Sequence, residues 1–120
     1  MDIVGKTLET LAVLEDKGII VQQGWYDESI KKLHVTVWNL GDYGGEGSDD
    51  EIEVEIAAVQ VCIWSNKDQI KLKKRIKRLM CKAGFAFMGA NDNLETDTKI
   101  FMNAARFMAA EEAEQEDEEE

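Results

Sequence analysis

The segment EIEVEIAAVQVCIW, residues 51–64, constrains the fold most, because polar and apolar residues alternate along it as they do in a β-strand. The alternation changes phase midway. Ile52, Val54 and Ile56 share one phase, and the apolar residues beyond Ala58 share the other. A one-residue bulge at Ala57–Ala58 would bring both sets to one face of a sheet. Alternatively, the C-terminal part of this strand is buried on both faces.

Shorter segments on either side predict three more strands. IIVQ at 19–22 is one, and FAFM at 85–88 is another. LHVTVWNL at 33–40 alternates, which predicts a half-buried strand with His34 on its outward face. The glycine-rich segment 41–50 predicts a flexible loop, and GANDN at 89–93 predicts a turn.

Two segments have helical periodicity. Residues 2–17 would begin at an Asp2 cap, end at Gly18 and bury a stripe of Val4, Leu8, Leu11 and Ala12. The second helix, at about 66–83, would be capped by Ser65, with Asp68 three residues on, and would end at Gly84. Its apolar stripe is Leu72, Ile76, Leu79, Met80 and Ala83.

Residues 98–108 fit either a helix or a strand by periodicity alone. The order of helix, strands, helix and strands predicts an α+β fold with two helices packed on an antiparallel sheet of four to five strands. A chain of 120 residues fits a single domain, which we expect to span 1–110. The last ten residues, 111–120, hold eight acids and no base, so we expect a disordered tail.

The composition narrows the class of protein. No apolar run approaches the ~20 residues of a membrane span. The N-terminus lacks the pattern of a secretory signal, and two cysteines are too few for a disulfide scaffold, so a reducing cytosolic compartment is expected. Cys62 and Cys81 show no zinc-ligand spacing, and the single histidine has no nucleophile near it in sequence. These residues therefore indicate neither a catalytic site nor a zinc site.

The second predicted helix is strongly basic, since residues 64–85 hold eight of the fourteen Lys and Arg residues. The formal net charge is −11, and −3 without the last ten residues. Three interpretations of this helix stay open: a solvated or subunit-facing surface, a DNA contact, or a partner for the acidic tail. A membrane-surface role is disfavoured, because the apolar stripe has no Trp or Phe anchor.

Three groups of residues are candidates for a subunit or partner interface. Aromatic side chains are enriched at interface centres, and complementary charges orient partners. The candidates are the aromatic residues Trp25, Tyr26, Trp38 and Tyr43, the acidic row Glu51, Glu53 and Glu55, and the helix bases Lys71, Lys74 and Arg78.

The segment order of residues 15–108, with VQVCIWS before the basic helix and ETDTKIFMNAARF after it, resembles tail-completion, tail-terminator and head-to-tail joining proteins of tailed phages and prophages. The resemblance implies that 98–108 is a strand. It also implies a hexameric ring of this chain between capsid connector and tail tube, with no catalysis and no cofactor. The implied partners are other copies, tail-tube and connector proteins, in the host cytoplasm during assembly and then in the virion.

In such a ring DNA would only pass through, so the bases would lie outside the lumen or between subunits, facing acids such as the Glu51–Glu55 row of a neighbour. A different class of function is also open, a small acidic inhibitor or DNA mimic that binds a nucleic-acid-processing enzyme. A third is nucleic-acid binding through the second helix. Neither terminator nor joining protein is favoured over the other by the sequence.

Overall fold

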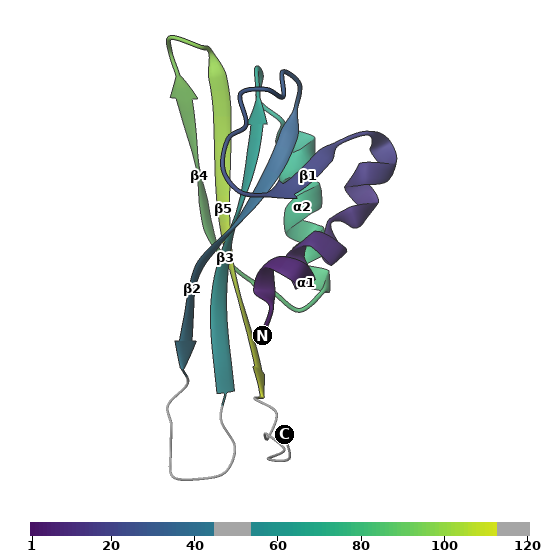
Figure 1. The fold of residues 1–120 in the computed structure, drawn as a ribbon, viewed down its shortest axis with the longest axis vertical. Helices are drawn as coiled ribbons and strands as arrows, with labels where there is room; N and C mark the ends of the chain where they lie inside the picture. Colours follow the sequence, from purple (N-terminus) through teal and green to yellow (C-terminus); the bar gives the residue numbers. More distant parts are fainter. Residues whose placement is uncertain (45–53, 113–120) are drawn as a thin grey trace.

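The computed structural model describes residues 1–44 and 54–112, which form an α+β fold with the helices on one face of a five-stranded sheet (Figure 1). The strand order is β1-β2-β3-β5-β4. The elements are α1 (Ile3–Thr10), a 3₁₀ helix (Ala12–Lys17), β1 (Ile20–Gln23), β2 (His34–Gly44), β3 (Val54–Ser65), α2 (Ile70–Lys82), β4 (Ala86–Glu95) and β5 (Ile100–Glu112).

The sheet is mixed, which corrects the prediction of a purely antiparallel one. β1 pairs parallel with β2, with Ile20 opposite His34, and the other neighbouring strands pair antiparallel. Two parallel strands cannot be joined by a tight hairpin, because the chain must first return to the end of the sheet at which the first strand began. Here the return is made by residues 24–33, which carry Trp25 and Tyr26 over Trp64. The strand at 19–22 was thus predicted, but its direction was not.

The ends of the first helical segment are as predicted. The Gly5 backbone N–H donates to Asp2 Oδ1 at 2.9 Å, so Asp2 caps α1. Gly18 adopts the left-handed conformation, with φ of +83°, and ends the 3₁₀ helix.

The middle of this segment differs from the prediction of one helix over 2–17. The α-helical winding stops at Leu11, and a 3₁₀ helix with about three residues per turn follows. Leu11 and Leu14, three residues apart, are therefore both buried, whereas Ala12 of the predicted stripe is exposed.

β3 is buried on both faces at its C-terminal end, as the second interpretation of the sequence predicted. Every residue from Ala57 to Ser65 is buried. The predicted bulge at Ala57–Ala58 is wrong, because the register of β3 with β5 is continuous over the described strand. The irregularity is in β2 instead, where Leu40 is the extra residue between the partners of Val59 and Ala58.

Two strands are longer than predicted. β2 continues to Gly44, so the loop predicted at 41–50 is wrong for 41–44, and the rest of it lies outside the described residues. β4 continues to Glu95, so the turn predicted at 89–93 is wrong. β4 extends because it pairs with β5 along most of its length, with a single irregularity between Phe87 and Gly89.

Residues 100–112 form strand β5, which confirms the strand implied at 98–108. This strand lies between β3 and β4 and pairs with both. Pairing on two sides and burial of Ala104, Ala105 and Phe107 override the helix propensity of the alanines and methionines. β5 includes Glu111 and Glu112, and the remainder of the predicted tail lies outside the described residues.

The second helix begins later than predicted. Ser65 stays in β3, and its hydroxyl accepts hydrogen bonds from the Lys67 backbone N–H at 3.2 Å and from Gln69 Nε2 at 3.0 Å. The Ser65 cap is therefore wrong, and α2 begins after Gln69 without a side-chain cap. Leu72, Ile76 and Met80 of the predicted stripe are buried.

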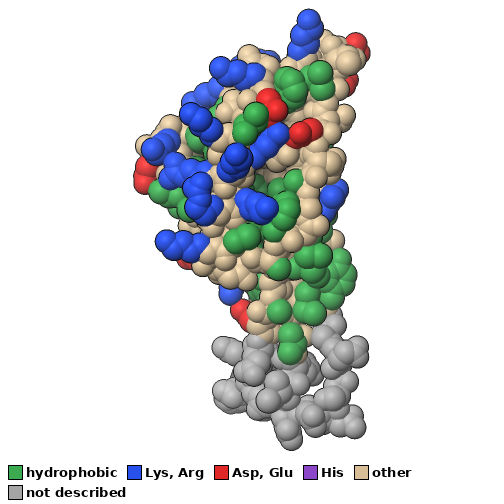
Figure 2. Space-filling model, turned by 180° about the vertical axis from the view of Figure 1, so that it is seen from behind, with side chains coloured by type: hydrophobic (Ala, Val, Ile, Leu, Met, Phe, Trp, Pro, Cys, Tyr) green, Lys and Arg blue, Asp and Glu red, His purple; other side chains and the backbone are tan. Residues whose placement is uncertain are grey.

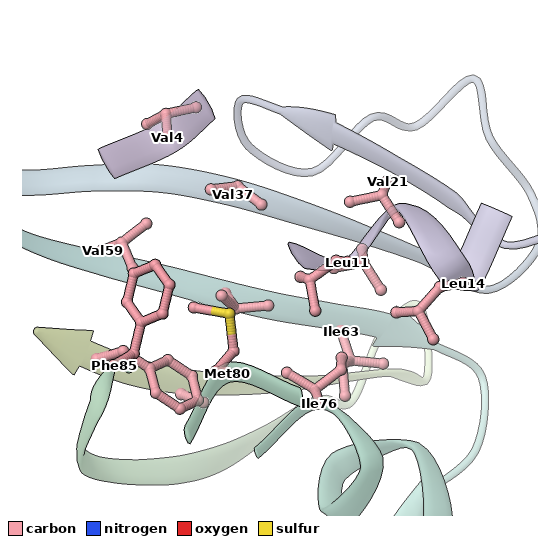
Figure 3. Close-up of a cluster of buried hydrophobic side chains, with 14 of the residues drawn as sticks. Val4, Leu11, Leu14, Val21, Val37, Val59, Ile63, Ile76, Met80 and Phe85 are labelled. Carbon is pink, nitrogen blue, oxygen red and sulfur yellow. The ribbon is translucent and has the colours of Figure 1, made fainter. Parts of the chain in front are cut away.

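The main core lies between the helices and one sheet face (Figure 3). Residues of both helices, of the 3₁₀ helix and of the strands converge there. Phe107, Leu11, Leu14, Val35, Val37, Val59 and Met80 are fully buried. The helices therefore cover only one of the two faces of the sheet.

Candidate interaction surface

The sheet face opposite the helices carries a group of aromatic side chains that we call the aromatic cluster: Trp25, Tyr26, His34, Trp38 and Trp64. Side chains alternate between faces along a strand. Because Val35 and Val37 of β2 point into the main core, His34, Thr36 and Trp38 point to the other face. The register places Trp64 of β3 directly opposite His34.

Trp64 is the centre of the aromatic cluster. Its ring centroid lies 5.4 Å from that of Trp25, edge-on, and 4.9 Å from that of Tyr26. Trp25 also meets Trp38 edge-on at 6.2 Å, and Tyr26 stacks on His34 at 5.7 Å. Edge-to-face and offset pairs of this kind are the favoured aromatic geometries. The connection between β1 and β2 is therefore held against the sheet by aromatic contacts.

The aromatic cluster shares Trp64 and Tyr26 with a small second core on the same sheet face. Cys62, Trp64 and Ala104 are buried there, with Tyr26, Ile100 and Met102 packed around them. The Trp64 indole N–H donates to Thr36 Oγ1 at 2.9 Å, which satisfies a buried donor. Burial raises the pKa of the Cys62 thiol. This thiol is thus a packing group, in keeping with its position inside the sheet.

His34 is buried, which corrects its predicted place on an exposed strand face. It is 1% exposed beneath Tyr26 and Trp64. Its Nδ1 lies 3.0 Å from the Lys32 carbonyl oxygen, and since a carbonyl can only accept, Nδ1 carries the proton. Its Nε2 is buried and has no hydrogen-bond partner among the described residues.

A hollow of about 330 Å³ opens beside the aromatic cluster. Three aromatic residues line it, and Glu95, the last residue of β4, is an acidic lining residue. The lining consists of Trp25, Tyr26, Trp64, Asn93, Glu95, Thr98, Ile100 and Met102. The sequence alone did not indicate Trp64, Glu95 or this hollow, because β3, β4 and the connection between β1 and β2 meet only in the folded chain.

Three of the four predicted aromatic interface residues are in the cluster, and the fourth lies further along β2. Trp25, Trp38 and Tyr43 are 48%, 45% and 50% exposed, which is unusual for such large apolar side chains. Tyr43 pairs with Ile56 towards the end of the sheet, where Val54 is also exposed. The aromatic cluster, Tyr43 and Val54 make this a partly open sheet face with exposed apolar side chains.

The predicted basic residues lie on the other side of the molecule. Lys71, Lys74 and Arg78 are exposed on α2, which packs on the opposite sheet face from the aromatic cluster. Figure 2 shows Lys and Arg side chains gathered over one part of the surface, apart from a group of hydrophobic side chains. The structure therefore does not bring the predicted bases and aromatics together within one chain.

Two other lysines of α2 are engaged within the chain. Lys73 Nζ lies 2.7 Å from Asp68 Oδ1 and 3.1 Å from Asp92 Oδ1. The hydrogen bond to Asp68 is the main cause of a raised pKa of Lys73. Lys77 Nζ lies 4.2 Å from the centre of the Phe87 ring, a cation–π contact.

The predicted acidic row is only partly described. Glu55 Oε1 lies 2.6 Å from the Met1 amino group, and this hydrogen bond raises the pKa of that amine. Glu51 and Glu53 lie outside the described residues. All fourteen Lys and Arg residues lie within the described residues, together with fourteen of the 25 acids. The described part is thus neutral overall, and the formal charge of −11 belongs to residues 45–53 and 113–120.

No family model matches the chain, and no curated protein matches it either. Within residues 1–44 and 54–112, no helix has the length and apolarity needed to cross a membrane. The same residues contain no group of three or more His, Cys, Asp or Glu side chains suited to a metal ion. The structure defines an α+β protein with one covered and one partly open sheet face.

Proposed function

We propose that this protein is a structural component of a tailed phage or prophage virion. It assembles with copies of itself into a ring at the head–tail junction or at the tail end, as a tail terminator or joining protein. It acts by shape, without catalysis or a cofactor, and away from membranes. Its partners are tail-tube and connector proteins, in the host cytoplasm during assembly and then in the virion, and DNA only passes through the ring.

The observation that carries this proposal is the open aromatic face of the sheet. Three large aromatic side chains, Trp25, Trp38 and Tyr43, are about half exposed on it. Contiguous exposed apolar surface usually marks a protein-protein contact, and aromatic residues are favoured at its centre. An assembly protein would cover this face in the ring. The resemblance in segment order adds the place of assembly, and the strand at residues 100–112 agrees with that resemblance.

The distribution of charge also favours an assembly role over the acidic inhibitor or DNA mimic. A mimic needs carboxylates spread over the folded surface to imitate phosphates. Here the described fold has equal numbers of acids and bases, and its bases are concentrated on α2. A basic helix on one side and an aromatic sheet face on the other suit contacts between subunits, because complementary surfaces guide association.

The proposal is tested by sedimentation velocity over a wide concentration range, followed by negative-stain electron microscopy of the heaviest species. We expect closed rings, with six copies as the resemblance implies. A protein that stays monomeric at every concentration would count against the proposal. A mobility-shift measurement with duplex DNA at low salt should show little binding. Tight binding that weakens steeply with salt would instead support a nucleic-acid role for α2.

A further inference from the structure

We infer that the hollow beside Trp25 is a cation-binding site that receives a Lys or Arg side chain from helix α2 of a neighbouring copy. This inference rests on the proposed self-association and names the two surfaces that meet. The receiving surface is the hollow lined by Trp25, Tyr26, Trp64 and Glu95. The inserted surface is the exposed ridge of α2 formed by Lys71, Lys74 and Arg78.

The chemistry of the hollow suits a cation. The rings of Trp25 and Tyr26 both lie against Trp64, so three aromatic groups border one space. The negative faces of aromatic rings attract ammonium and guanidinium groups, and tryptophan does so most strongly. Glu95 is also among the lining residues, so an acidic side chain is available to pair with a cation bound there. The volume, about 330 Å³, admits the end of a long side chain.

Helix α2 offers a matching cation. Residues 71, 74 and 78 are spaced by three and four, so they form one ridge on the helix surface. All three are exposed. The same helix already uses both kinds of contact within the chain, since Lys73 pairs with Asp92 and Lys77 lies over the Phe87 ring. The ridge therefore carries ammonium and guanidinium groups, which an aromatic and acidic hollow can bind.

The positions of the two surfaces determine the kind of assembly. The hollow lies on the sheet face opposite the helices, and α2 lies on the helix-covered face. A contact between unlike surfaces on opposite sides of a protein is head-to-tail and repeats from copy to copy. It gives a ring if the rotation between copies closes and an open filament if it does not, and the ring is the form that the proposed function requires. A contact of the aromatic face with itself would instead give a two-fold dimer and leave α2 free.

The experiment uses two full-length variants that each lose one surface. The hollow variant combines Trp25→Ala with Glu95→Lys, and its control is Asp97→Lys, which places the same charge on a neighbouring exposed residue outside the hollow. The helix variant combines Lys71→Glu, Lys74→Glu and Arg78→Glu. Its control, Lys71→Arg with Lys74→Arg and Arg78→Lys, keeps the charge. Circular dichroism and thermal unfolding verify that every variant is folded.

We expect each variant alone to need at least tenfold higher concentration than the wild type to associate, while both controls assemble normally. Mixed together, the two variants should form a one-to-one dimer and nothing larger, because only one competent pair of surfaces remains. If the wild type forms rings and the helix variant does so equally well, this inference fails and the ring proposal stands. If the wild type does not associate at all, both fail.

Discussion

The indole N–H of Trp64 donates a hydrogen bond to the hydroxyl of Thr36 at 2.9 Å, across β2 and β3 on the sheet face opposite the helices. This bond orients the ring at the centre of the aromatic cluster, where Trp25 and Tyr26 pack against it. Trp64 is only 8% exposed although no helix within residues 1–44 and 54–112 covers that face.

Replacing Thr36 with Val should therefore destabilise the protein by about 1–3 kcal/mol, because the indole N–H would stay buried without an acceptor. The free energy of unfolding is measured by urea titration. Thr36→Ser keeps the acceptor and should lose clearly less. Equal stability of Thr36→Val and the wild type would show that this bond does not hold the ring.

Two phenylalanines in neighbouring strands should respond very differently to truncation. Phe107 is 0% exposed and belongs to the main core, whereas Phe87, whose ring lies 5.6 Å away, is 36% exposed. We expect Phe107→Ala to lower the free energy of unfolding by about 3–5 kcal/mol. Phe87→Ala should cost less than half as much, because less buried area is lost. Chemical denaturation of both variants tests this, and equal losses would contradict the described burial.

Asp92 should make part of the stability depend on pH. A hydrogen bond from the Asn103 amide, followed by that from Lys73, lowers the pKa of Asp92. A lowered pKa in the folded state means that the carboxylate stabilises the fold above its unfolded pKa of about 4. This stability is lost as the pH falls through the folded pKa.

The difference in unfolding free energy between wild type and Asp92→Asn should thus be constant above about pH 5 and shrink below about pH 4. Because the carboxylate is more than half exposed, we expect no more than about 1 kcal/mol. Asn103→Ala, which removes the largest cause of the shift, should flatten the pH dependence. The same wild-type advantage at pH 3 and pH 7 would refute the assignment.

The two cysteines should differ in reactivity towards a thiol reagent. Cys81 is exposed on α2, whereas Cys62 is fully buried and burial raises its pKa. Since the thiolate is the reactive form, Cys81 should react at least a hundredfold faster. Cys62 should react only as the fold opens. In Cys81→Ser the fast phase should vanish, and a surviving fast phase would place Cys62 at the surface.

Some features of the fold could be predicted because neighbouring residues alone produce them. Asp2 can accept from an amide only three residues away, and Gly18 can adopt a positive φ wherever it stands. Strands β1, β2 and β3 lie where alternation or β-branched residues predicted them, β3 over its described part from Val54 to Ser65. The extension of β4 was not predictable locally, because Gly89 and the asparagines after it stay extended only through pairing with β5.

The candidate site was predicted in part. Trp25, Tyr26 and Trp38 were expected at a contact surface, and they meet on one face. His34 was predicted on the outward face of its strand, as a surface or interface residue, and it lies on that face but is buried. Strict alternation identifies two faces without saying what covers the second. The available signal was a pair of aromatics, Trp25 and Tyr26, in the connection between two strands, since such residues can fold back over the sheet.

The sequence by itself determined that helical segments lie near 2–17 and 66–83 and strands near 19–22 and 33–40, where the first helix is capped, and that the second helix is strongly basic. These follow from short-range backbone and side-chain preferences. Only the tertiary structure decided that β1 runs parallel to β2, that residues 100–112 are a strand, and that Trp64 lies between Trp25 and His34. Those outcomes depend on contacts between residues far apart in the chain, which local patterns do not encode.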